Sequence, residues 1–253
     1  MKIIHRFVVM LLAMAALLAL IVPVQASEMD ERIISSARQS YLFKTFLVND
    51  NIKIESTDGV VTLTGVAADG FNKSVAEETV AGLPGVKSVD NRLEIKGETP
   101  ALNSDAWIRN QVKYTLLFHR SVNARTTEVD VRDGVVTLRG DAVSQAQKEL
   151  TTEYARDVEG VKDVNNKMIV AETAKDAPTT IGQAIDDASI TAQVKLTLLF
   201  HRSTSAVNTK VETNNGDVTL YGKANNVAEK DLATKFANDI NGVNSVKNRM
   251  TIK

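Results

Sequence analysis

The sequence contains no cysteine, and this absence limits both its chemistry and its architecture. Disulfide bonds, thiolate catalysis and a lipid-modified cysteine anchor are all excluded, because each needs a thiol. Packing alone must therefore hold the fold, even in an oxidising compartment.

The sequence also lacks the features of a nucleic-acid-binding protein. Aromatic residues make up 5% of the chain, which leaves few platforms on which bases could stack. The whole chain has 30 basic and 31 acidic residues, and removal of the N-terminal segment described next would take away two basic ones, leaving 28 against 31. A net charge of −3 provides no basic field for a polyanion. Nucleic acid is not expected as a partner.

The N-terminal segment has the layout of a secretory signal peptide. Lys2 and Arg6 form a basic start, an apolar run of 16 residues follows, and small residues surround Ala26. The run is shorter than the roughly 20 residues of a membrane-spanning helix. Residues 1–26 are therefore interpreted as a signal peptide cleaved after Ala26, and the mature protein is expected in the periplasm.

Three internal repeats account for nearly all of the remaining chain. The segments DGVVTLTG (58–65), DGVVTLRG (133–140) and NGDVTLYG (215–222) correspond to one another, and in each copy a Gly-Val pair follows 26 residues after the turn glycine. The second and third copies also share QVK-x-TLLFHRS. The predicted units span 30–97, 103–171 and 185–253, with a linker over 172–184.

Each unit predicts the element order α-β-β-α-β. Ile108, Val112 and Leu116 recur at helical spacing, as do Ile190 and Val194 in the third copy. An Asp-Gly or Asn-Gly pair between two alternating segments then predicts a hairpin.

A second helix and a final strand complete the predicted unit. The second helix is expected to bury the stripes Phe71-Val75-Thr79, Ala146-Leu150-Tyr154 and Ala228-Leu232-Phe236, and to end at Gly85, Gly160 or Gly242. The long connection to the final strand favours a parallel crossover. We therefore expect an α+β fold of three tandem units, each a three-stranded mixed sheet covered by two helices.

The repeats resemble the BON domain family. The resemblance rests on the αββαβ order, the G-x-V-x-L-x-G strand and the G-V-x-x-V-x-N segment, which is present at 85–91, 160–166 and 242–248. It implies a role at the bacterial envelope in osmotic or envelope stress. The implied partners are an anionic phospholipid membrane surface or exported, unfolded envelope proteins. A structural spacer or a chaperone-like protein without lipid binding remains the alternative.

The repeated Leu-Phe-His-Arg segment supplies the candidate binding residues. Its histidines lie near the predicted end of the first helix, where cations interact favourably with the helix dipole, and a ligand contact is the alternative. An aromatic side chain beside an arginine could face a membrane or a client, or the phenylalanine could pack against the hairpin. The candidate surface residues are Phe118, His119, Arg120, Phe200, His201 and Arg202.

Other recurring residues are interpreted as structural. The glycines suit turns and strand ends, since no phosphate-binding glycine motif occurs. The asparagines are in phase with the apolar residues of the last strand, where an amide can satisfy a strand end. These residues are Gly59, Gly65, Gly85, Gly134, Gly140, Gly160, Gly216, Gly222, Gly242, Asn91, Asn166 and Asn248.

No catalytic or metal-binding arrangement recurs with the structural motifs. His119 and His201 are the only histidines after the signal peptide, one in each of two units, which is too few for a zinc site within a unit. The neighbours His119-Arg120-Ser121 offer adjacency without the geometry of a triad. The sequence therefore predicts a protein without cofactors that is not an enzyme, and leaves its oligomeric state open.

The signal-peptide interpretation makes a direct prediction. The exported chain is expected to begin at Ser27, because small residues precede that position and no cysteine is present to carry a lipid. N-terminal sequencing of the periplasmic fraction measures this. Membrane-bound protein that retains residues before Ser27 would contradict it.

Overall fold

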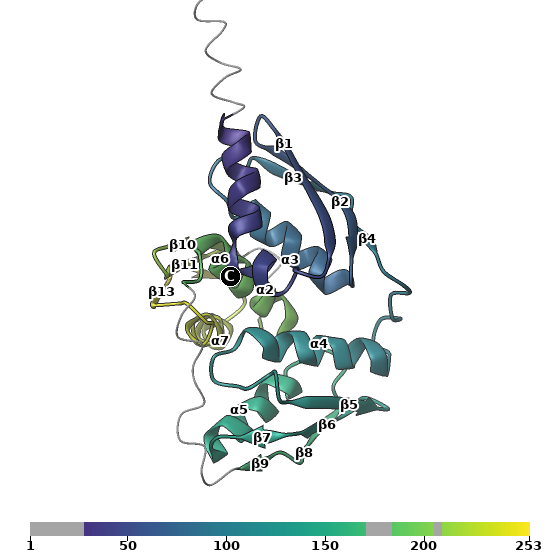
Figure 1. The fold of residues 1–253 in the computed structure, drawn as a ribbon. Coiled ribbons are helices and arrows are strands. Elements are labelled where there is room, and N and C mark those ends of the chain that lie inside the picture. Colours follow the sequence, from purple (N-terminus) through teal and green to yellow (C-terminus); the bar gives the residue numbers. More distant parts are fainter. Residues whose placement is uncertain (1–27, 171–183, 205–208) are drawn as a thin grey trace, which may run out of the picture.

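The computed structural model describes residues 28–170, 184–204 and 209–253, and these form three αββαβ units (Figure 1). The expected signal peptide (1–26) and nearly all of the expected linker (172–184) lie outside the described residues. The expected α+β class is confirmed in all three units.

The first unit differs from the others in its first helix, which is broken at Ser40. A helix over 28–39 is followed by a short second helix, α2. The other elements of this unit are α2 (Tyr41–Thr45), β1 (Asn51–Thr57), β2 (Val60–Ala67), α3 (Gly70–Ala81), β3 (Ser88–Asn91) and β4 (Glu94–Ile95).

The second and third units have matching elements. Those of the second are α4 (Asp105–Phe118), β5 (Glu128–Arg132), β6 (Val135–Arg139), β7 (Asp141–Ala142), α5 (Gln145–Arg156), β8 (Asp163–Asn166) and β9 (Ile169–Val170). Those of the third are α6 (Asp187–Phe200), β10 (Lys210–Asn214), β11 (Asp217–Tyr221), β12 (Lys223–Ala224), α7 (Val227–Asn238), β13 (Ser245–Asn248) and β14 (Thr251–Ile252).

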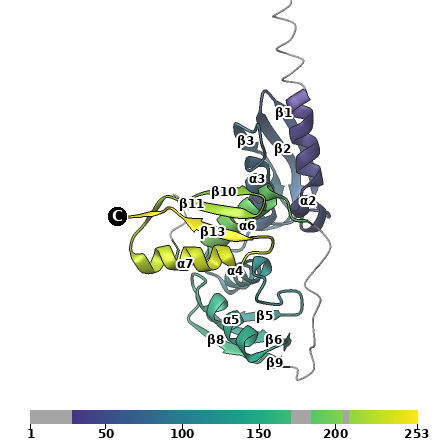
Figure 2. The ribbon, with the colours of Figure 1, turned by 90° about the vertical axis from the view of Figure 1, so that its left-hand side faces the viewer.

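Each sheet is mixed, with the second hairpin strand in the centre. In the second unit β6 pairs antiparallel with β5 and parallel with β8, and Leu138 lies opposite both Val129 and Asn166. The two helices pack on the face that carries Val136 and Leu138, both fully buried. The opposite face carries no helix of its own unit, as Figure 2 shows for the third unit, where Asp217 of β11 is exposed and Thr219 and Tyr221 are partly exposed.

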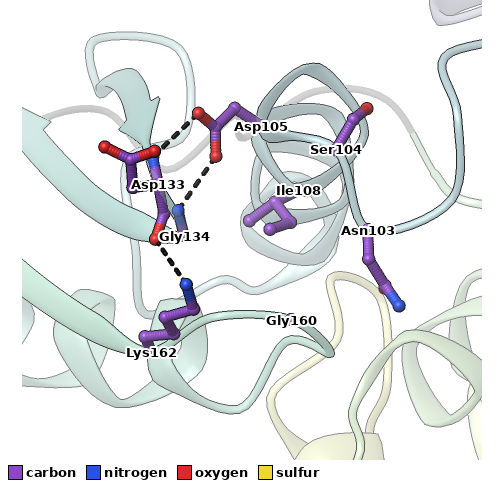
Figure 3. A pocket seen from close by; sticks show the side chains of 8 residues that line it. All are labelled: Asn103, Ser104, Asp105, Ile108, Asp133, Gly134, Gly160 and Lys162. Carbon is purple, nitrogen blue, oxygen red and sulfur yellow. Dashed lines mark hydrogen bonds between the residues drawn. The ribbon is translucent and has the colours of Figure 1, made fainter.

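A carboxylate from the first helix closes each hairpin turn. Asp133 and Gly134 both have positive φ, as the predicted type I′ turn requires. Their N–H groups donate to the Asp105 carboxylate at 2.8 and 2.9 Å (Figure 3). Asp30 and Asp187 make the same contacts in the other units. In the hollow beside this turn, the N–H groups of Asp133 and Gly134 are therefore already occupied by a carboxylate.

These carboxylates connect folding to pH. The side-chain hydrogen bond from Ser56 and the N–H of Gly59 hold the pKa of Asp30 below its usual range, and the Gly134 and Asp133 N–H groups lower the pKa of Asp105. A lowered folded-state pKa stabilises the fold above the ordinary carboxyl pKa of about 3.9. That contribution is lost as the pH falls through the lowered value.

Three predictions about local structure were wrong in detail. The second helices end at Ala81, Arg156 and Asn238, a turn before the expected glycines. The expected stripe Phe71-Val75-Thr79 is buried in the first unit, but Ala146 and Ala228 are exposed, so the buried stripes of the other two units are offset from those expected. The last strand is split in two, because the Asn166 Oδ1 accepts the N–H of Met168 while its Nδ2 donates to Lys148. Asn91 and Asn248 make equivalent contacts.

Helix α6 lies at the centre of the molecule, and most of its residues are buried on every side of the helix. Besides its apolar stripe, the small or uncharged residues at Ser189, Thr191, Ala192 and Gln193 are buried. At the positions corresponding to the first three of these, α4 has Trp107, Arg109 and Asn110, which stay partly exposed. A helix without a charged face is suited to a position where other elements cover it on several sides.

The first unit packs against the N-terminal part of α6. The N–H of Tyr41 donates to the Asp186 carboxylate at 2.7 Å, and the N–H of Leu42 donates to Ser189 Oγ at 3.3 Å, so the break at Ser40 presents free backbone donors to α6. Lys195 forms an ion pair with Glu78 at 2.8 Å.

Gly82, the residue that ends α3, is expected to set how closely the first unit approaches α6. A Cβ at this position would lie 3.3 Å from the Cα of Ala188. Gly82→Val should therefore lower the free energy of unfolding by about 1–3 kcal/mol through overpacking. Urea unfolding measures the loss, with the exposed neighbour Ala81→Val as the control. Equal midpoints for the two variants would show that this contact does not constrain the packing.

Candidate functional site

The two Leu-Phe-His-Arg segments meet each other at the junction of the second and third units. The side chains of His119 and His201 are 2% and 0% exposed, and Phe118 is 1% exposed. The expectation that these three residues form a binding surface is wrong, because each segment packs against the other unit. Phe200 is half-buried, while Arg120 and Arg202 are exposed.

The contacts across this junction are reciprocal. The Nδ1 of His119 lies 3.1 Å from the Asp239 carboxylate, and the Nδ1 of His201 lies 3.0 Å from that of Asp157. Ser121 and Ser203 donate to the second oxygen of the same carboxylates. Asp157 and Asp239 are the C-caps of α5 and α7, so the first helix of each unit ends on the second helix of the other.

The two imidazole rings face each other at the centre of this arrangement. Their Nε2 atoms are 3.1 Å apart. Tyr154 stacks on His119 and Phe236 stacks on His201, each with ring centroids 3.9 Å apart. We call the six residues His119, His201, Asp157, Asp239, Tyr154 and Phe236 the histidine junction.

Backbone hydrogen bonds hold the same junction together. The N–H of Arg120 donates to Asp239 O at 2.8 Å, and that of Arg202 donates to Asp157 O at 2.9 Å. The two arginine side chains differ, however. Arg120 donates to the carbonyls of Asn238, Ile240 and Val243, at 2.5 to 2.9 Å, and so satisfies the end of α7. Among the described residues, the guanidinium of Arg202 makes a single contact, a 3.7 Å ion pair with Asp157.

Aromatic side chains join all three units beside the histidine junction. Phe71 of the first unit stacks on Tyr114 of the second, with centroids 3.9 Å apart, and also contacts Phe118 and Phe200. The Tyr114 hydroxyl donates to Asp69 at 2.5 Å. The few aromatic residues of the chain are therefore concentrated where units meet, which the low aromatic content did not predict.

Burial and hydrogen bonding set the ionisation of the junction. Burial raises the pKa of Asp239, but hydrogen bonds from His119, Ser121 and Tyr154 outweigh it and hold that pKa below its usual range. Burial lowers the pKa of His119 more than the Asp239 hydrogen bond raises it. Burial and Asp239 together raise the pKa of Tyr154 far above its usual value. Asp239 is therefore an anion that accepts three hydrogen bonds.

The junction does not have the geometry of a hydrolytic triad. Ser121, His119 and Asp239 are close together, but the serine donates to the carboxylate and the histidine Nε2 faces the other imidazole. A nucleophilic serine must instead donate to the histidine that serves as its base. Within the described residues, no group of three metal-ligating side chains gathers here or elsewhere.

Comparison of the three copies reveals a sequence signal for the histidine junction that the residue pattern of a single unit does not show. His119 and His201 correspond to Lys44 in the first copy, and Asp157 and Asp239 correspond to Gly82. The stacking residues Tyr154 and Phe236 correspond to Thr79. The copy that lacks the histidine thus also lacks its carboxylate and its aromatic neighbour, as expected of residues that contact one another across units.

A second surface, the open sheet face of the third unit, is distinguished by its charge. Tyr221 lies at its centre, with Lys210 and Arg249 over its ring at 5.8 and 5.9 Å. We call this surface the third-unit sheet face and define it by Lys210, Glu212, Asp217, Thr219, Tyr221, Lys223, Lys247, Arg249 and Thr251.

The corresponding faces of the other units have the opposite sign. The third-unit sheet face has four basic side chains and two acidic ones, a balance of +2. The equivalent positions of the second unit hold Glu128, Asp130, Asp141, Arg139 and Lys167, and those of the first hold Lys53, Glu55, Asp90, Arg92 and Glu94, a balance of −1 in each case. The folded chain therefore concentrates positive charge on one face.

The unequal roles of the two arginines are testable. Arg120→Gln is expected to lower the free energy of unfolding by about 1–3 kcal/mol, because it removes hydrogen bonds to carbonyls at the end of α7. Arg202→Gln, the matched variant in the other repeat, should cost less than about 1 kcal/mol. Chemical denaturation compares them. Equal losses would mean that the Arg120 side chain does not stabilise the junction.

The comparisons with known proteins agree with the repeat structure. The sequence matches the BON domain over residues 30–97, 104–172 and 186–253. It is 32% identical to Osmotically-inducible protein Y of Escherichia coli over 202 residues, which is 80% of this chain and 98% of that protein.

Two further relatives each match a smaller part of the chain. Outer membrane lipoprotein DolP of Haemophilus influenzae is 30% identical over 162 residues, covering 64% of this chain and 74% of that protein. A 21 kDa hemolysin of Actinobacillus pleuropneumoniae is 33% identical over 114 residues, covering 45% and 56%. The chain belongs to the BON family and is similar to Osmotically-inducible protein Y, with three BON domains in one chain.

Proposed function

We propose that the protein is a non-enzymatic binding protein of the bacterial periplasm that associates with the anionic phospholipid surface of the envelope during osmotic or envelope stress. The names of its relatives support the stress and envelope parts of this proposal, since one is osmotically inducible and another is an outer membrane lipoprotein. Among the described residues, no helix is long and apolar enough to cross a membrane.

The third-unit sheet face carries the lipid part of the proposal. Its basic side chains are exposed, and they surround a tyrosine whose ring and hydroxyl suit the boundary between lipid headgroups and water. Each basic residue held near an anionic membrane contributes about 1 kcal/mol of attraction. The local balance of +2 can therefore outweigh the slightly acidic character of the chain as a whole.

This proposal moves the lipid contact away from the Leu-Phe-His-Arg segments. Those segments are occupied in holding the second and third units together, and Arg120 is engaged with three backbone carbonyls. The shared core also favours a single body over a spacer of independent units, because α6 packs against both other units. Binding of exported client proteins remains the alternative that the following experiment distinguishes.

Neutralising the third-unit sheet face should abolish vesicle binding. The triple variant Lys210→Gln, Lys223→Gln and Lys247→Gln loses three cations, so its affinity for vesicles that contain phosphatidylglycerol should fall by roughly 100-fold at low salt. Co-sedimentation with those vesicles, and with phosphatidylcholine vesicles as the uncharged comparison, measures the change.

A control variant separates this face from charge in general. Arg139→Gln with Lys167→Gln removes two cations from the equivalent face of the second unit and should leave binding nearly unchanged. If the parent protein does not bind the anionic vesicles, or both variants bind as it does, the lipid proposal fails. Suppression of aggregation of an unfolded exported protein by the parent and the triple variant alike would then favour client binding.

A further inference from the structure

We infer that the histidine junction is a proton-binding site, in which His119 and His201 hold one proton between their Nε2 atoms and thereby couple the second unit to the third. The inference is independent of the proposed lipid binding. It begins from the 3.1 Å separation of the two Nε2 atoms, both within a buried site.

The carboxylates decide which ring atoms carry hydrogen. Asp239 accepts hydrogen bonds from Ser121 and Tyr154 as well as facing His119 Nδ1, so it is an anion and that Nδ1 must bear a proton. Asp157 likewise accepts from Ser203 and faces His201 Nδ1. Each imidazole is thus a donor at Nδ1, which leaves a lone pair on each Nε2 if both rings are neutral.

Two lone pairs 3.1 Å apart repel, whereas one added proton converts the contact into a hydrogen bond. One ring is then an imidazolium and the other is its acceptor. Each ring faces its own carboxylate through Nδ1, so either ring can be the imidazolium and the other its acceptor.

A proton fits this site better than a metal ion does. The two rings are enclosed by the stacked Tyr154 and Phe236, and the only nitrogen ligands present are the two that already contact each other. Zinc needs further ligands that the described residues do not supply here. The carboxylates that orient each Nδ1 equally stabilise an imidazolium.

The charged groups around the junction are compatible with one added positive charge. Each imidazole faces one carboxylate, and the helix ends contribute carbonyl oxygens that Arg120 already satisfies. A hollow over the junction has charged side chains from three elements at its edge. These are Glu153, Arg156, Asp157, Arg202 and Lys235, with Asp239 and Arg120 on the opposite side of the junction.

Because of the shared proton, docking of the two units is most stable at one intermediate pH. Opening the junction releases two ordinary histidines with pKa values of about 6.5. Below that pH the open state binds two protons and the docked state one, so falling pH favours opening. Above it the open state binds fewer than one, so rising pH also favours opening. On each side of this pH, the docking equilibrium constant falls by up to tenfold per pH unit. We call these two pH ranges the acid limb and the alkaline limb.

Hydrogen exchange of the full chain tests this inference. The N–H groups of Arg120 and Arg202 donate across the junction, so their protection factors report its opening, while the N–H of Leu138 reports a strand within one unit. We expect protection at the two arginines to fall on both sides of about pH 6.5. Two neutral rings would produce the acid limb only, so protection that stays constant from neutral to alkaline pH would overturn the inference.

Variants and spectroscopy separate the proton from the packing. His201→Gln supplies a donor that does not titrate, and should lose the alkaline limb. Tyr154→Phe, which copies Phe236 of the other half, should keep both limbs. Nitrogen-15 spectra of the histidines should show both Nδ1 protonated and one shared Nε2 proton at pH 7. Independent titration of the two rings, or a rise in protection when Zn²⁺ displaces that proton, would refute the site.

Discussion

The structure depends on the packing of the first helix of one unit against the end of the second helix of another. A unit of this size buries only about 60% of the surface that its unfolded chain exposes, so contacts between units supply part of the stability. The C-cap position of the second helix makes this contact in all three units, through Gly82, Asp157 and Asp239. The same helix end thus serves the interface of the first unit with the third and that of the second unit with the third.

The two interfaces use that position through different chemistry. Gly82 lets α3 approach α6 closely, so the first unit docks by apolar packing and a few hydrogen bonds. Asp157 and Asp239 instead each bind a histidine and a serine of the other unit. The first unit has a residue without a side chain at this position, whereas the second and third units have a carboxylate there. This difference in contacts matches the difference in sequence between the first copy and the other two.

Because of this docking, the three repeats differ in which of their surfaces are buried and which stay open. The most similar segments of the second and third units pack against the other unit. Helix α6 has small or uncharged residues at positions where α4 has larger or charged ones. The surfaces that remain open can then differ in charge without affecting the core. The third-unit sheet face carries a balance of +2 and its counterparts −1, although all three sheets have the same strand order.

The sequence by itself determined the repeats, the αββαβ order and the hairpin turns, because these depend on neighbours close in the chain. The positive φ of Asp133 and Gly134 and the burial of Val112 are local consequences of turn chemistry and helical spacing. Tertiary structure decided the role of His119, since its partners Asp239 and His201 lie 120 and 82 residues away. A pattern within one unit cannot show whether a residue faces solvent or another unit, because that depends on how separate units pack together.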